Sequence, residues 1–185
     1  MTPRFHKLAA DEMSPLQREV AAEIAAGPRG EVRGPFVALI HHAALARPIQ
    51  NLGEFLRFGA SLPLPLLEMA ILMTARRWTC QHEWYAHERL ARKAGLGEHI
   101  IAALMRGEQP EPMSEAEREV YAFCREAHDG GHVSDGPFEA VKARFGNEGV
   151  LELLCVSGYY SMMAMVLNSA RMPLPENAPP PLTPL

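Results

Sequence analysis

The sequence predicts an all-α protein, and three observations support that prediction. Apolar residues recur at helical spacing nearly throughout the chain. No stretch alternates convincingly between apolar and polar residues as a strand does, and no Asn-Gly or Asp-Gly hairpin signal accompanies one. Hydrophobic residues make up 48% of the chain and charged residues 22%, which is typical of a folded globular core and not of a disordered chain.

The first predicted helix covers residues 14–26 and has clear signals at both ends. Ser14 is suited to the N-cap and Pro15 to the first helical position, and Gly27-Pro28 ends the helix. Glycine and proline set the next boundaries. They predict a loop over 29–36, a helix over 36–46 and, after Pro48, a second helix over 49–60.

Two helices in the middle of the chain carry most of the chemically reactive side chains. The first lies within residues 61–78 and begins near Pro65. The second covers 79–95, with Thr79 as the expected N-cap and Gly95 as the stop. Shorter helices are predicted at 97–105, at 114–128 with Ser114 and Glu117 as a capping box, and at 135–145, followed by a long apolar helix at 147–168.

The domain organisation expected from these patterns is simple. The chain has 185 residues, which suits a single domain, here over residues 1–172. Residues 173–185 are rich in proline and predict an extended, polyproline-like tail.

Composition excludes several classes of function. The net charge of −4 and the absence of a basic run argue against a nucleic-acid partner. Three widely spaced cysteines do not indicate a disulfide framework, and no signal peptide is visible, so we expect a cytoplasmic protein. The apolar run 149–168 is interrupted by Glu152, which favours a buried helix over a membrane span.

Residues 80–88, CQHEWYAHE, form the most reactive stretch of the sequence. Cys80, Glu83 and His87 are spaced i, i+3, i+7 and fall within about 60° on one helix face. Glu83 and His87 are four apart and can touch. His82 and His87 are about 140° apart on the helix, so they cannot both bind one metal ion, and we expect no metal site. The simpler alternative is a buried Cys80 beside a surface Glu83–His87 pair.

Glu68 lies in an apolar run, LPLLEMAILM, on the preceding helix. A carboxylate in such a run must either reach the helix edge or be buried with a partner. A buried Glu68 facing His87 or Cys80 would have a proton affinity tuned for catalysis.

The sequence of residues 66–96, LLEMAILMTARRWTCQHEWYAHERLARKAGL, resembles the central motif of the carboxymuconolactone decarboxylase family, which includes the AhpD-like alkylhydroperoxidases. Glu68, Cys80 and His87 fall on the motif's glutamate, first cysteine and histidine. The resemblance implies an all-α bundle built around a helical hairpin and a homo-oligomer. We expect a trimer, dimer or hexamer, and no cofactor.

The motif's second cysteine is replaced here by Glu83. In the peroxidase branch of the family that cysteine attacks the hydroperoxide, so the two-cysteine cycle cannot run within this motif. The decarboxylase branch uses acid–base chemistry on a small carboxylated lactone, and this variant is closer to it. Two alternatives stay open: a peroxidase using Cys80 with an external thiol, and a non-catalytic oligomeric or ligand-binding protein.

Three further features have both a functional and a structural interpretation. Trp84 can wall a substrate pocket or pack in the core. His41 can reach the pocket and bind substrate or play a structural role. The "RRW" stretch at 76–78 can offer a cation to an anionic substrate, although arginine is also favourable at a helix C-terminus.

Overall fold

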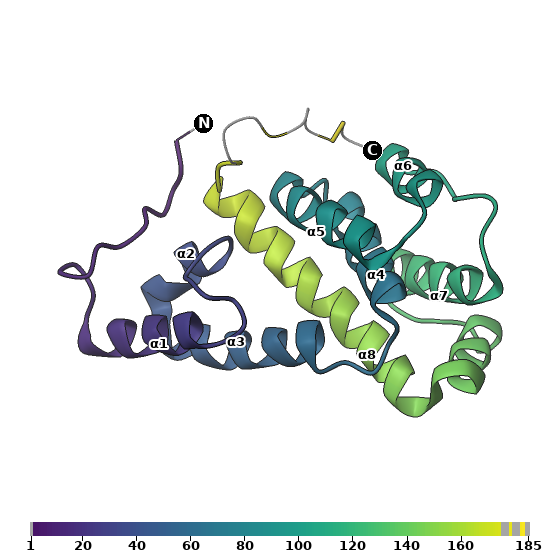
Figure 1. The fold of residues 1–185 in the computed structure, drawn as a ribbon, viewed down its shortest axis with the longest axis horizontal. Helices are drawn as coiled ribbons and strands as arrows, with labels where there is room; N and C mark the ends of the chain where they lie inside the picture. Colours follow the sequence, from purple (N-terminus) through teal and green to yellow (C-terminus); the bar gives the residue numbers. More distant parts are fainter. Residues whose placement is uncertain (1, 175–177, 179–181, 184–185) are drawn as a thin grey trace. The chain divides into compact units, whose positions relative to one another are not determined.

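The structure is a computed structural model that describes residues 2–174, 178 and 182–183. The predicted all-α class is confirmed, because the described residues contain helices and no strand (Figure 1). The chain divides into two compact units. The N-terminal unit comprises residues 1–60 and 165–173, and the central unit comprises 61–164 and 174–185. The single domain predicted over 1–172 stays a prediction.

The N-terminal unit is built on the packing of α1 (Pro15–Ala26) against α3 (Ala43–Phe58) (Figure 1). Ser14 caps α1 as predicted, and Gln17 completes a capping box with it. The short helices α2 (Phe36–Leu39) and η1 (Ile40–His42) connect the two.

The predicted helix break at Pro48 is wrong, because Pro48 lies inside α3. The break falls earlier, at His42, whose backbone is non-helical and whose side chain caps α3 by accepting from the Leu45 N–H. Proline removes one hydrogen bond from the helix interior. The helix continues through it because a buried face from Ala43 to Leu56 holds it in place.

The centre of the central unit is α4 (Leu64–Arg77). Every residue from Leu66 to Arg76 is buried, as expected for a helix covered on all sides. It packs against α5 (Gln81–Ala94), α6 (Glu98–Arg106) and α7 (Glu115–Gly130) (Figure 1). The predicted stop of α5 at Gly95 and capping box of α7 at Ser114 and Glu117 are confirmed.

A tight turn over residues 78–80 joins α4 to α5, and here the predicted N-cap is wrong. Thr79 has a left-handed backbone with φ of 45°, unusual for a β-branched residue. Its N–H bonds to the Arg76 carbonyl, and the Cys80 N–H bonds to the Ala75 carbonyl, so Thr79 closes α4. Cys80 is the N-cap of α5, one position later than expected, and makes no side-chain capping bond.

The last helix, α8 (Asp135–Ala170), contains a kink at Gly146, where φ is 69°. The kink falls between the two helices predicted at 135–145 and 147–168. The hydrogen bonds of the Glu152 carboxylate explain why a charged residue lies in this apolar stretch. It accepts from the N–H groups of Ser61 at 2.8 Å and Leu62 at 3.1 Å, which ties α8 to the segment before α4.

Among the described residues, α8 is the one helix long and apolar enough to cross a membrane by length and composition, and 56% of its most apolar stretch is buried in the protein. The cytoplasmic location and the absence of a membrane partner stay predictions. The extended tail predicted at 173–185 lies largely outside the described residues. Leu182 is described: it is buried, and its backbone exchanges two hydrogen bonds with the Gln81 side chain.

Candidate functional site

Glu68, Glu83 and His87 converge inside the central unit, which confirms the predicted geometry. His87 Nδ1 lies 2.8 Å from Glu68 Oε2, and His87 Nε2 lies 3.3 Å from Glu83 Oε2. Only 4% of the surface of Glu68 and of His87 is exposed, and Glu83 is also buried. The alternatives of a surface Glu83–His87 pair and of a Glu68 at the helix edge are therefore wrong. We call these three side chains the acid–base cluster.

The local sequence explains how the acid–base cluster forms. Glu83 and His87 are one helical turn apart on α5, so their side chains meet without help from the rest of the fold. Glu68 comes from α4, and the 78–80 turn brings α5 back against that helix. The left-handed backbone of Thr79 in this turn therefore helps to place the His87 imidazole against the Glu68 carboxylate.

The charge of His87 follows from two opposing effects. Burial alone would lower the pKa of His87, because a charged imidazole loses its hydration. The carboxylates of Glu68 and then Glu83 outweigh burial and raise the pKa of His87 from 6.5 to about 9. The ring is therefore an imidazolium at neutral pH, with both N–H groups directed at carboxylates, and it is a proton donor in its resting state.

Tyr160 is a member of this site that the sequence did not reveal. Its ring lies edge-to-face against His87, with centroids 4.9 Å apart and planes at 86°. The contact restricts the movement of the imidazole ring. Tyr160 lies far along the chain, in the apolar stretch of α8, where its surroundings in the sequence indicate only core packing.

Cys80 is placed beside the acid–base cluster but is not poised to react. Its side chain is 0% exposed. Burial and then the charge of Glu83 raise the pKa of the Cys80 thiol to about 12, although N–H groups at the start of α5 act in the opposite direction. Cys80 is therefore a neutral thiol at physiological pH.

The two predicted substrate-binding residues lie in different units. Trp84 is 3% exposed in the central unit, so it packs in the core. Its indole N–H has no hydrogen-bond partner among the described residues. His41 belongs to the N-terminal unit, where its ring contacts Phe5 and His6. Its role in substrate binding stays a prediction.

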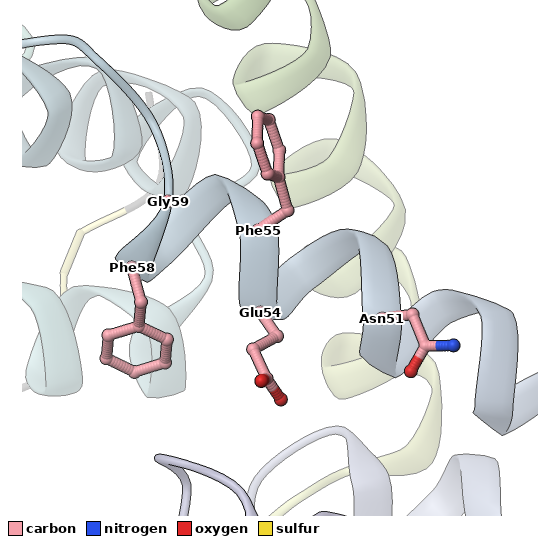
Figure 2. A pocket seen from close by; sticks show the side chains of 5 residues that line it. All are labelled: Asn51, Glu54, Phe55, Phe58 and Gly59. Atoms are coloured by element: carbon pink, nitrogen blue, oxygen red, sulfur yellow. The ribbon is translucent and has the colours of Figure 1, made fainter.

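A cavity of about 460 Å³ lies against α3 in the N-terminal unit. It is lined by Asn51, Glu54, Phe55, Phe58 and Gly59 (Figure 2). Figure 2 shows Glu54 and Phe58 directed to one side of the helix and Phe55 to the other. Glu54 accepts a hydrogen bond from Gln50, and the lining contains no histidine or cysteine, so this cavity offers no acid–base pair.

The acid–base cluster has no nitrogen available for a metal ion, because both ring nitrogens of His87 face carboxylates. In the part of the chain that the structure describes, no group of three or more His, Cys, Asp or Glu residues is arranged to hold one. A scan against protein-family models and a search of curated proteins found no match to this chain. Membership of the family that the motif resembles therefore stays a proposal.

Proposed function

We propose that the protein is an enzyme of the carboxymuconolactone decarboxylase family that removes carbon dioxide from a small carboxylated lactone or a related organic acid. The observation that supports this most strongly is the buried imidazolium of His87 between two carboxylates. The AhpD-like helical bundle is part of the same proposal, supported by the packed pair of α4 and α5.

The resting charge of His87 assigns its role in such a reaction. When the substrate's carboxylate leaves as carbon dioxide, the electron pair of the broken C–C bond moves into the conjugated carbonyl system. The contact of His87 Nε2 with Glu83, the longer of its two contacts at 3.3 Å, then opens, and Nε2 donates its proton to the carbon that lost the carboxylate. Glu68 and Glu83 keep the imidazole charged beforehand and oriented throughout, and a proton from water restores the imidazolium.

Two features of the surroundings fit this chemistry. The burial of the acid–base cluster excludes water, which strengthens the electrostatic effect of each charge on the reacting group. Trp84 offers an indole N–H without a partner among the described residues, and a substrate oxygen is a suitable acceptor for it. The side chains of the cluster are buried, so substrate entry requires local opening.

The state of Cys80 is why the decarboxylase proposal ranks above the peroxidase alternative. A peroxidase needs a thiolate as nucleophile, and a buried thiol with a pKa of about 12 supplies almost none at neutral pH. The same Glu83 that raises the thiol's pKa also raises that of His87, so it opposes one chemistry and assists the other.

A homo-oligomer is also part of the proposal. The α3 helix exposes a series of large apolar side chains, namely Leu45, Leu52, Phe55 and Phe58. Large apolar side chains left exposed on a helix are candidates for burial in an interface between subunits. A trimer, dimer or hexamer would cover it.

The proposal is tested by following loss of a carboxylated muconolactone by absorbance and release of carbon dioxide. We expect turnover by the wild type, a loss of roughly a hundredfold or more in His87→Ala and Glu68→Gln, and retained turnover in Cys80→Ser. Glu139→Gln, which removes an exposed carboxylate of the same unit, is the matched control. Dithiol-dependent hydroperoxide consumption that disappears in Cys80→Ser would replace the proposal with the peroxidase alternative. Absence of both activities would favour a non-catalytic protein.

A further inference from the structure

A second cavity, of about 150 Å³, lies in the central unit, and its lining carries three arginines and two carboxylates. Three arginines line it: Arg76 and Arg77 at the end of α4, and Arg125 on α7. Glu68 precedes Arg76 on α4 by a distance of about 12 Å along the helix axis, so this cavity is separate from the acid–base cluster.

Arg76 is the unusual member of this lining. It is 4% exposed, and no carboxylate lies within ion-pair distance of it among the described residues. Its Nε has no hydrogen-bond partner there, and Nη1 makes only a long contact of 3.4 Å to the Thr79 hydroxyl. Burial lowers the pKa of Arg76, but a guanidinium cannot lose its proton in a protein. A buried cation left in this state costs free energy unless an anion compensates it.

The other charges of the lining do not supply that anion. Asp129 pairs with Arg77 at 2.9 Å, and Glu108 pairs with Arg106 at 2.7 Å. Arg125, like Arg76, has no carboxylate within ion-pair distance among the described residues, and its guanidinium lies 5.9 Å from the centre of the Tyr121 ring. Arg76 is therefore a buried cation with no carboxylate to compensate it, and Arg125 is an exposed cation of the same lining.

His128, which also lines the cavity, is neutral. Burial lowers the pKa of His128 to about 4, with Arg77 acting in the same direction. The Thr74 hydroxyl donates its one proton to the Ala70 carbonyl at 2.9 Å, so His128 Nε2, 3.1 Å away, must be the donor in their contact. The ring is thus held in one tautomer and adds no charge.

We propose that this cavity is a binding site for a small oxyanion, a carboxylate or phosphate group, held between Arg76 and Arg125. A guanidinium presents parallel N–H donors that match two oxygens of either group. The volume of about 150 Å³ is below the range of cavities that enclose whole drug-sized ligands, so it suits an inorganic ion or the charged end of a larger molecule. The proposal does not depend on the proposed decarboxylase activity.

Isothermal titration calorimetry on the full chain tests this site with two probes, inorganic phosphate and succinate, at constant ionic strength. We expect saturable binding of at least one probe in the wild type. In Arg76→Met the affinity should fall roughly tenfold or more, because the buried donor is lost while the volume is nearly kept. Arg89→Met, which removes an exposed arginine of α5, should bind as the wild type does.

Arg125→Met keeps the test decisive if Arg76→Met does not fold, because Arg125 is exposed and its loss leaves the core intact. We expect it to weaken binding several-fold with an unchanged circular dichroism spectrum. Binding of phosphate alone identifies a phosphate site, and binding of succinate alone identifies a carboxylate site. The proposal is overturned if neither probe binds below roughly 20 mM, or if the folded arginine variants bind as tightly as the wild type.

Discussion

The raised pKa of His87 makes the stability of the protein depend on pH in a defined direction. The folded protein holds this proton with a pKa of about 9, against 6.5 for the ordinary side chain. A group whose pKa rises on folding stabilises the fold fully below its unfolded pKa and loses that contribution as pH rises through its folded pKa. Two and a half pKa units correspond to about 3 kcal/mol, of which about 2 kcal/mol should be lost between pH 6.5 and about pH 8.5.

Substitution of Glu68 by glutamine is the perturbation that isolates this effect. It removes the closer carboxylate, 2.8 Å from His87 Nδ1, while keeping an oxygen that can accept the hydrogen bond. We expect the free energy of unfolding to fall by about 2 kcal/mol at pH 6.5, because a charge-assisted hydrogen bond in a buried site is weakened. We also expect a smaller dependence on pH above that value, because Glu83 alone raises the pKa of His87 less.

Urea unfolding followed by circular dichroism at several pH values between 6.5 and about 8.5 measures both quantities. The range ends there because the pKa values of Cys80 and Cys124 are also raised, and their thiols affect stability above about pH 9. His132→Gln, which removes an exposed imidazole, is the control and should keep the wild-type dependence. Identical pH dependence in the wild type and in Glu68→Gln would refute this explanation.

Three further predictions concern the fold and the thiols. Glu152→Ala removes the acceptor of two backbone N–H groups and should lower the free energy of unfolding by about 3 kcal/mol. Glu148→Ala, at an exposed position, should change the free energy of unfolding little, and equal effects of the two substitutions would contradict this prediction. Gly146→Ala places a side chain at a φ of 69° and should cost about 1 kcal/mol in chemical denaturation, but Gly136→Ala, with open space and no left-handed backbone, should not destabilise. Mass spectrometry after iodoacetamide treatment of the folded protein should find Cys155 alkylated first of the three cysteines, and faster labelling of either buried thiol would show that the native state opens there.

The sequence was informative wherever an interaction is local. The Glu83–His87 pair, the Ser114 capping box and the Gly95 stop all depend on residues within one or two helical turns, and each was predicted. Glu68 was predicted for a different reason, because a carboxylate in an apolar run requires a buried partner.

The errors and omissions have the opposite character. Thr79 was expected to cap a helix, yet packing of α5 on α4 holds it in a left-handed conformation that its sequence disfavours. Pro48 was expected to end a helix, but burial of one face of α3 maintains the helix through it. Arg76 and Arg77 were noted as possible cations for an anionic substrate, but the contact of Tyr160 with His87 and the place of Arg125 in the same cavity were not found, because these residues come from helices distant in the sequence.

The charge state of His87 is the central claim of this account, and nitrogen NMR of its imidazole ring measures it directly. The ring signals can be assigned by their absence in His87→Gln and followed from about pH 6 to pH 10. We expect both ring nitrogens to stay protonated through neutral pH, with a titration midpoint at about 9. A midpoint at or below the ordinary value of 6.5 would contradict the assignment of His87 as a buried imidazolium and proton donor.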